Sequence, residues 1–296
     1  MGKRKINGLV AQIGRTDIIL LADLLDLSDQ GNDHGEREIE PNTPSVARIY
    51  DYFLGGKDNF AVDREAADLI TATMPFLPSI ARANRSFIRR AVRRLVRDYG
   101  IRQFIDVGAG LPAQQSVHAI AQEIAPESRV VYVDNDPVVC SHGRALLQGQ
   151  GSAMVQGDLR EPDAIIDHPM TRSLIDFSQP FALLLAAILH FVPDDANPGA
   201  LIARFRDTMA PGSFLVISHG TLEGEDINER ARLSTDVYKQ ASATLSLRRP
   251  EAVRALFDGF ELIEPGLVWI HNWPTPSESP INQEQTLRGG AGRLPG

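Results

Sequence analysis

The stretch FIDVGAGLP, residues 104–112, joins a hydrophobic run to a glycine-rich turn, and a helical pattern begins just beyond it. This order predicts a strand, a tight turn and a helix. In an open α/β sheet, ligands bind at the carboxyl ends of the strands, where glycines let a ligand approach the backbone closely. Such turns also serve only to change the chain direction, so this stretch alone leaves a ligand site and a plain turn both open.

The alternation of strand and helix continues from this stretch to about residue 270. Strands are predicted at residues 103–107, 130–133, 153–156, 181–187 and 214–218, and helices near 113–125, 137–147 and 198–209. Such alternation implies right-handed crossovers and a mostly parallel sheet covered on both faces. Around Pro265-Gly266, residues 260–264 and 267–270 read as an antiparallel hairpin. We therefore predict a Rossmann-like, doubly wound α/β fold with a C-terminal antiparallel hairpin.

Composition divides the chain into four regions. Residues 1–42 are expected to be a flexible extension and residues 43–99 a helical lid or cap. The ligand-binding domain is expected at 100–273, and 274–296, rich in Pro, Gly, Ser and Gln, is expected to be a flexible tail. The last helix of the cap carries seven arginines between Arg82 and Arg97, which form either an anion-binding surface or a solvated helix face.

The overall composition excludes several classes of protein. A formal net charge of −8 argues against binding to nucleic acid or to anionic membranes. The longest apolar run, residues 181–189, is too short to span a bilayer, and the single cysteine excludes both an internal disulfide and a Cys-rich zinc site. We expect a cytoplasmic protein without a metal site.

Acidic residues follow the second and third predicted strands. Asp134 and Asn135 come directly after residues 130–133, and Asp158 and Leu159 follow the next strand. An acid at the first position is placed to accept hydrogen bonds from both hydroxyls of a ribose. A carboxylate at the second could receive the exocyclic amine of adenine. We therefore predict a nucleoside site at this edge of the sheet.

Asp106 distinguishes between two kinds of adenosine ligand. The spacing of Gly108 and Gly110 also fits the dinucleotide pattern, but a carboxylate two residues before Gly108 would repel a pyrophosphate. S-adenosylmethionine has no phosphate and carries an ammonium and a sulfonium, which an acid attracts. We expect Asp106, Gly108 and Gly110 to hold its methionine end.

Two histidines follow the predicted central strands. His190 comes after the apolar run at 183–189, and His219 follows the strand at 214–218. Either could be a general base that deprotonates a methyl acceptor, because imidazole titrates near neutral pH. Either could instead hydrogen-bond to the backbone and shape the pocket.

The string ARIYDYFLGGKDNF, residues 47–60, resembles a bacterial family of S-adenosyl methyltransferases first described as a domain of unknown function. The resemblance continues at residues 81–85, 106–112, 132–137 and 189–193, and it covers about residues 44–273. It implies a class I methyltransferase fold with extra N-terminal helices beside the cofactor site, and it implies no particular acceptor. The sequence departs from the usual methyltransferase pattern at Leu111-Pro112, where a further glycine is common.

The N-terminal helices are then expected to form a lid, with Gly55-Gly56 as its hinge. Alternatively, Gly55 is an ordinary helix C-cap and Lys57 an ordinary surface charge. The residues expected to act in the lid or on the substrate are Tyr52, Gly55, Gly56, Lys57, Asn59, Arg82 and Asn84.

Together these features predict an S-adenosylmethionine-dependent methyltransferase that transfers the methyl group by in-line displacement to a small-molecule acceptor, with S-adenosylhomocysteine as the product. Two alternatives stay open: a non-catalytic sensor of S-adenosylmethionine or a related nucleoside, and an NAD(P)-dependent reductase. The acceptor and the oligomeric state do not follow from the sequence.

Overall fold

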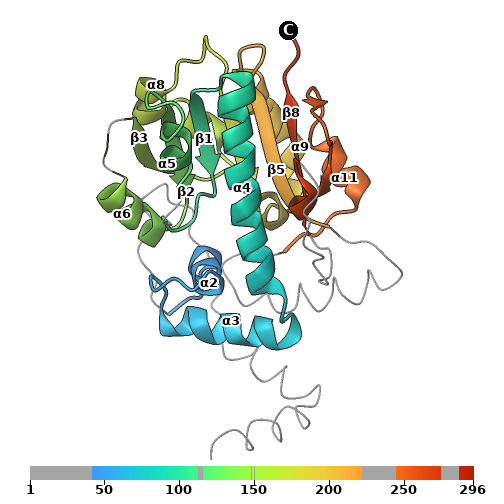
Figure 1. Cartoon of the computed structure of the whole chain (residues 1–296). Coiled ribbons are helices and arrows are strands. Elements are labelled where there is room, and N and C mark those ends of the chain that lie inside the picture. Colours follow the sequence, from blue (N-terminus) through green and yellow to red (C-terminus); the bar gives the residue numbers. More distant parts are fainter. Residues whose placement is uncertain (1–41, 113–115, 148, 150, 222–244, 275–286) are drawn as a thin grey trace, which may run out of the picture. The chain divides into compact units, whose positions relative to one another are not determined.

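The computed structural model describes residues 42–112, 116–147, 149, 151–221, 245–274 and 287–296 (Figure 1). The expected N-terminal extension therefore lies outside the described residues, apart from residue 42. The first three residues of the helix predicted at 113–125 also lie outside the described residues. The described part of this helix is α5, Val117–Gln122.

Within the described residues the sheet has eight strands, in the order β3-β2-β1-β4-β5-β8-β6, and β7 also pairs with β8. The first five strands run parallel to their neighbours: β1 Gln103–Val107, β2 Arg129–Asp134, β3 Ser152–Gln156, β4 Ala182–Ala186 and β5 Phe214–Gly220. The last three are antiparallel to the strands they pair with: β6 Glu261–Leu262, β7 Val268–Trp269 and β8 Leu287–Arg293. A doubly wound, mostly parallel sheet with an antiparallel C-terminal part is confirmed.

Helices cover both faces of the sheet. On one face lie α4, Leu77–Tyr99, and α5, and α4 crosses the front of the sheet in Figure 1. On the other lie α7 Pro162–Ile166, α9 Pro198–Arg206 and the turn that follows α11 Pro250–Ala255. The remaining described helices are α2 Val46–Phe53, α3 Ala61–Thr73, α6 Pro137–Leu146, α8 Pro169–Leu174 and the 3-10 turns η1 Leu189–Phe191, η2 Asp194–Ala196 and η3 Ile270–Asn272. None of these described helices is long and apolar enough to cross a membrane.

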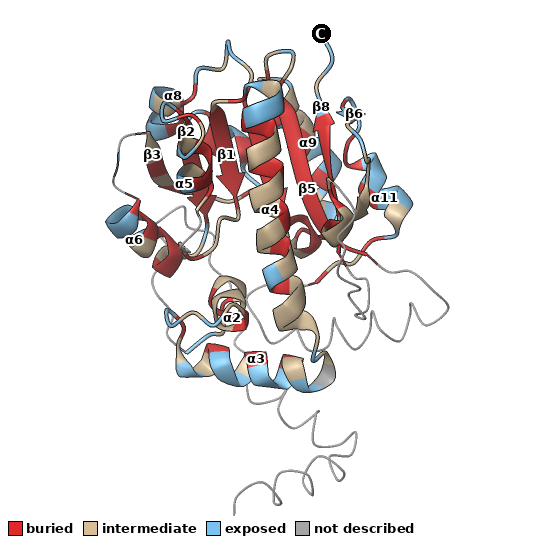
Figure 2. Ribbon diagram, in the orientation of Figure 1, coloured by how far each residue is buried: buried red, intermediate tan, exposed pale blue. Residues whose placement is uncertain are grey.

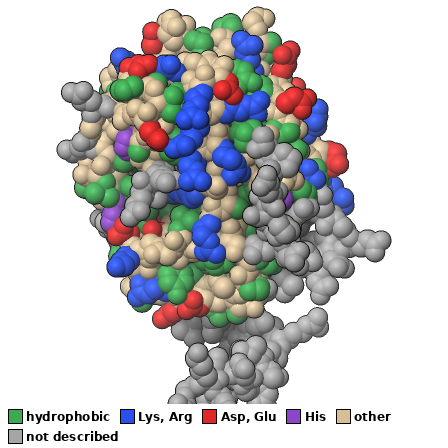
Figure 3. Space-filling model, in the orientation of Figure 1, with side chains coloured by type: hydrophobic (Ala, Val, Ile, Leu, Met, Phe, Trp, Pro, Cys, Tyr) green, Lys and Arg blue, Asp and Glu red, His purple; other side chains and the backbone are tan. Residues whose placement is uncertain are grey.

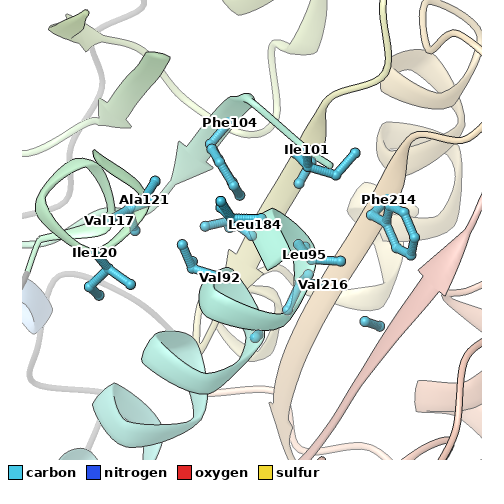
Figure 4. Packing of buried hydrophobic residues seen from close by; sticks show 14 of the residues in the cluster. Val92, Leu95, Ile101, Phe104, Val117, Ile120, Ala121, Leu184, Phe214 and Val216 are labelled. Carbon is cyan, nitrogen blue, oxygen red and sulfur yellow. The ribbon is translucent and has the colours of Figure 1, made fainter. Parts of the chain in front are cut away.

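Alternate residues of the central strands belong to one or the other of two apolar clusters, one on each face of the sheet. Phe104 and Leu184 face α4 and α5, where they meet Val92, Leu95 and other side chains of the helices (Figure 4). The residues between them, such as Ile105, face α7 and α9. Burial therefore runs along the whole of the central strands, as Figure 2 shows. Strands buried on both faces read as nearly continuous apolar runs, which is why the sequence locates them well.

The prediction of a flexible tail at 274–296 is wrong for residues 287–293, which form strand β8. Residues 287–293 pair with β5 along seven positions and lie inside the sheet. The sequence LRGGAGR has little strand propensity. Its glycines instead permit close packing, because a Cβ at Gly289 would lie 2.8 Å from the Phe87 ring and one at Gly292 would lie 2.8 Å from Phe260. Tertiary contacts on both faces therefore stabilise a strand that propensity alone would not predict.

The strands on either side of Pro265-Gly266 do not pair with each other, which corrects the partners expected in the hairpin. Both β6 and β7 run antiparallel to β8, at Leu262–Gly292 and Val268–Gly289. They form one edge strand that the turn interrupts. The antiparallel direction of β6 and β7 was predicted. Their partner β8 was not, because its residues were expected to form a flexible tail.

The arginines of α4 form a basic stripe along this face of the molecule (Figure 3). Two of them hold the C-terminal segment in place. Arg90 donates to the carbonyls of Trp273 and Ile270, each at 2.6 Å, and Arg94 donates to the carbonyl of Glu264. Part of the stripe therefore fastens the edge strand to α4, a role that neither sequence-based interpretation included.

Candidate active site

The turn after β1 is shaped by two glycines with positive φ. Gly108 has φ +72°, and a Cβ there would lie 2.7 Å from the Ile188 side chain. Gly110 has φ +66°, and the nearest atom to its would-be Cβ is Nη2 of Arg85, 3.8 Å away. The left-handed conformation favours glycine at both positions, but only Gly108 also lacks room for a side chain. Gly110 is therefore required by its backbone conformation and not by a close neighbour.

Asp134, at the end of β2, ties the turns after β1 and β2 together. One carboxylate oxygen accepts from the backbone N–H of Gly110 at 2.9 Å, and the other accepts from that of Asp136 at 3.0 Å. Burial raises the pKa of Asp134 to about 6, although these hydrogen bonds oppose the shift. Each oxygen keeps a further lone pair, so the carboxylate can still accept from a ligand hydroxyl.

Asp106 lies on β1 beside Tyr132 of β2, on the face covered by α4. Its side chain is buried, and burial raises the pKa of Asp106 to about 7, while the charge of Arg85 lowers it and that of Asp134 raises it further. A carboxylate in this environment is stabilised by an approaching cation.

Asp158, which follows β3, already has hydrogen-bond partners for its carboxylate. Although burial raises the pKa of Asp158, hydrogen bonds from Arg160 and Asn135 bring that pKa to about 2. Arg160 donates through its side chain at 2.9 and 2.5 Å, and Asn135 Nδ2 donates at 3.2 Å. Leu159 is buried in the apolar cluster under this edge. The structure therefore brings Asn135 and Asp158 together, as a paired unit.

The two histidines lie next to each other, with ring centroids 5.5 Å apart. Nδ1 of His219 lies 2.6 Å from the carbonyl oxygen of Gly220, and its Nε2 lies 2.8 Å from Nη1 of Arg248. Both ring nitrogens are therefore engaged, Nδ1–H as a donor and Nε2 as an acceptor. Burial lowers the pKa of His219 to about 4. This geometry disagrees with the prediction that His219 acts as a general base, because no ring nitrogen is free to take a proton.

His190 is held differently. Its Nδ1 accepts from the backbone N–H of Gly220 at 3.3 Å, which places the ring proton on Nε2. Burial, followed by the charges of His219 and Arg248, lowers the pKa of His190 well below 6.5. The side chain is thus neutral, and Nε2–H is a donor. Arg248, which the sequence analysis did not include, fixes this region by also donating to the carbonyls of Leu189 and Val192.

The loop after α2 closes around Asp51. Its carboxylate accepts from Asn59 Nδ2 at 2.8 Å, and a Cβ at Gly56 would collide with it. Gly55 follows the C-cap with φ +80°, as in an ordinary helix C-terminus, and Lys57 is exposed. The geometry thus favours the C-cap alternative for Gly55.

Among the contacts of the described residues, Asn84 is the other expected lid residue that hydrogen-bonds to the sheet. Ser218 Oγ donates to Asn84 Oδ1 at 2.6 Å, and Asn84 Nδ2 donates to Tyr50 Oη at 3.1 Å. This buried chain links β5, α4 and α2. Tyr52 points elsewhere, to Asp68 of α3, and Arg82 is exposed and contacts Ser79.

Two arginines that the sequence analysis overlooked are central here. Arg48 is buried and connects α3 with the start of α6, through Asp63 at 2.7 Å and Asp136 at 3.6 Å. Arg85 reaches from α4 to the glycine turn, with Nη2 3.5 Å from the carbonyl oxygen of Leu111. The helical period could have indicated Arg85, since it lies four residues after buried Ala81 and so shares its face, whereas Arg82 does not.

Comparison with known proteins identifies the family. Residues 32–295 match the model of the S-adenosyl methyltransferase family. The chain belongs to this family. It is 38% identical to a candidate methyltransferase from Thermobifida fusca, over 86% of this chain and 96% of that one, with a TM-score of 0.81. It is 37% identical to a DUF574 family protein from Streptomyces avermitilis, over 87% of this chain and 100% of that one, with a TM-score of 0.82. No curated protein matches the chain.

This S-adenosyl methyltransferase therefore has the class I methyltransferase fold that the resemblance implied, and S-adenosylmethionine is its cofactor. The predicted family and cofactor class are confirmed.

Proposed function

We propose that this methyltransferase transfers the sulfonium methyl group to a small-molecule acceptor by in-line displacement. Bound S-adenosylmethionine supplies an activated methyl group, whose carbon bonds to a lone pair of the acceptor while the carbon–sulfur electron pair stays on sulfur. The protein mainly orients the reactants and excludes water. The net charge of −8 supports a small acceptor over a nucleic acid.

Asp106 carries the proposal. Its carboxylate is buried on β1, just before the glycine turn, and burial raises its pKa to about 7, while no described residue forms an ion pair with it. The ammonium of the methionine moiety supplies that cation, whereas a pyrophosphate would add a second negative charge. Asp106 and the turn from Gly108 to Gly110 are thus assigned to the methionine end.

Asp134 is assigned to the ribose. The backbone donors of Gly110 and Asp136 orient its carboxylate and leave one lone pair on each oxygen for the two ribose hydroxyls. Asn135, Asp158 and Leu159 are assigned to the adenine, which would share the Asp158 carboxylate with Arg160.

We assign the general-base role to neither histidine. Nδ1 of His190 accepts from the backbone, so its Nε2–H is left as a hydrogen-bond donor. This donor is suited to bind a hydrogen-bond acceptor on the substrate. His219 is suited to a positioning role, because Arg248 and the Gly220 carbonyl fix its ring. Asn84 has a similar role between the sheet and α2.

Replacing Asp134 tests the assignment of the cofactor site. We expect Asp134→Ala to weaken the binding of S-adenosylhomocysteine at least tenfold in calorimetric titration, because both ribose hydroxyls lose their acceptor. Asp258→Ala is the matched control, since that exposed carboxylate lies in the turn after α11, on the other face of the sheet. Wild-type affinity in Asp134→Ala would refute the ribose assignment.

A further inference from the structure

Ser45 is the N-cap residue of α2, but its hydroxyl does not cap that helix. A serine at this position usually accepts a hydrogen bond from the first turn of its own helix. Here Ser45 Oγ donates to Oδ2 of Asp136, 91 residues further along the chain. The backbone N–H of Ser45 is engaged separately, because it donates to Asp63 at 2.9 Å. The hydroxyl therefore connects the start of α2 with the start of α6.

The carboxylate of Asp136 is held from two sides. Its Oδ1 caps α6 by accepting from the backbone N–H groups of Val138 at 2.8 Å and Val139 at 3.4 Å. Its Oδ2 accepts from Ser45 and lies 3.6 Å from Nη1 of Arg48. Ser45 and Arg48 are both buried. The position of Asp136 is thus fixed jointly by α6 and by the N-terminal helices.

The backbone of Asp136 in turn orients Asp134. Its N–H donates to Asp134 Oδ1 at 3.0 Å and is one of the two backbone donors on that carboxylate. Burial, and after it the charge of Asp136, raises the pKa of Asp134. Partners that compensate the charge of Asp136 therefore favour the ionised form of Asp134, which is the better hydrogen-bond acceptor.

We propose that Ser45 and Arg48 are positioning residues for the ribose of the cofactor, because they hold Asp136 where its backbone N–H orients Asp134. This inference rests on the proposed function, in which Asp134 binds the two ribose hydroxyls. Hydrogen bonds weaken steeply as their geometry is distorted. A small shift of Asp136 should therefore weaken recognition of the hydroxyls more than recognition of the rest of the cofactor. The N-terminal helices are then a working part of the cofactor site.

The test compares S-adenosylhomocysteine with its 2′,3′-dideoxy analogue, which lacks both ribose hydroxyls. Calorimetric titration gives the ratio of the two dissociation constants for each protein. We expect the wild type to prefer S-adenosylhomocysteine by about 10- to 100-fold, the range for hydrogen bonds to a charged group. We expect Ser45→Ala to lower this preference at least about threefold, because only S-adenosylhomocysteine depends on the orientation of Asp134.

A matched control separates this effect from the loss of any hydroxyl. Ser178 Oγ also donates to a carboxylate, that of Asp176 at 2.6 Å, but both residues are exposed and precede β4, at the opposite edge of the sheet. Ser178→Ala is therefore expected to leave the preference unchanged. Ser45→Thr keeps the hydroxyl and is expected to restore most of the preference.

The ratio also distinguishes positioning from a purely structural role. If Ser45 only stabilised the N-terminal helices, Ser45→Ala would weaken both ligands equally and leave the preference at its wild-type value. That result, or a preference in Ser45→Thr no higher than in Ser45→Ala, would overturn the inference. Equal binding of the two ligands by the wild type would instead overturn the ribose assignment of Asp134, and this inference with it.

Discussion

Arg48 offers a test of how the N-terminal helices are held against the cofactor domain. Its side chain is 4% exposed and donates to the fully buried carboxylate of Asp63 at 2.7 Å. It also donates to the carbonyl of Thr43 at 2.6 Å and lies 3.6 Å from Asp136, which caps α6 two residues after Asp134. The substitution Arg48→Met keeps most of the aliphatic volume and removes every one of these contacts.

The expected cost follows from burial. Removing one partner of a buried ion pair leaves the other charge uncompensated and costs about 3–5 kcal/mol of unfolding free energy. Arg93 provides a matched control on α4, because its ion pair with Glu123 has the same length, 2.7 Å. The side chains of Arg93 and Glu123 are 38% and 61% exposed, respectively. For an exposed pair the cost is about 0–1 kcal/mol. Arg93→Met is therefore expected to change stability little.

Urea denaturation of both variants, followed by fluorescence and circular dichroism, measures the difference. The reasoning predicts that Arg48→Met loses at least about 2 kcal/mol more than Arg93→Met. The double variant Arg48→Met, Asp63→Asn should recover part of the loss, because the remaining buried charge is gone. Equal small losses in the two single variants would refute the claim that Arg48 joins α3 to α6 through a buried ion pair.

Three further predictions concern the site itself. Gly108→Ala should lower the unfolding free energy by about 2–5 kcal/mol, from left-handed strain and the collision with Ile188, whereas Gly110→Ala should cost only about 1–2 kcal/mol from strain, as urea titration would measure. Because the pKa of Asp106 is about 7 when folded and 3.8 ordinarily, its proton stabilises the folded state at low pH, and this contribution is lost as the pH rises from about 4 through 7. Asp106→Asn should therefore be less dependent on pH and more stable than wild type at pH 8, and unchanged pH dependence would contradict the assigned pKa. His219→Leu should cost about 1–3 kcal/mol, because the buried Arg248 loses one of its acceptors and the Gly220 carbonyl loses its side-chain donor, and no measurable loss would contradict the positioning role.

The parallel strands could be predicted from the sequence because burial on both faces requires nearly continuous apolar residues. Residues 103–107 match β1 at both ends, and the other parallel strands differ from their predicted bounds by at most two residues at either end. The antiparallel strand β8 could not be predicted in this way. Its glycines fit against Phe87 and Phe260, and these partners lie far away in the chain.

The same contrast applies to the site. Acids at the ends of β1 and β2 could be predicted, because the carboxyl ends of parallel strands meet at one edge. The expected lid residues were less predictable, because their roles depend on specific partners in space. Asn59 binds Asp51 within its own loop, while Asn84 reaches across to Ser218 of β5. The engagement of Nε2 of His219 likewise depends on Arg248, 29 residues further along the chain.

Parallel calorimetric titration of the wild-type protein with S-adenosylhomocysteine and with NADH tests the central claim most directly. Asp106 beside the glycine turn should favour a ligand that carries an ammonium and reject one that carries a pyrophosphate. We expect saturable, one-site binding of S-adenosylhomocysteine and no binding of NADH. Binding of NADH in place of S-adenosylhomocysteine would contradict it.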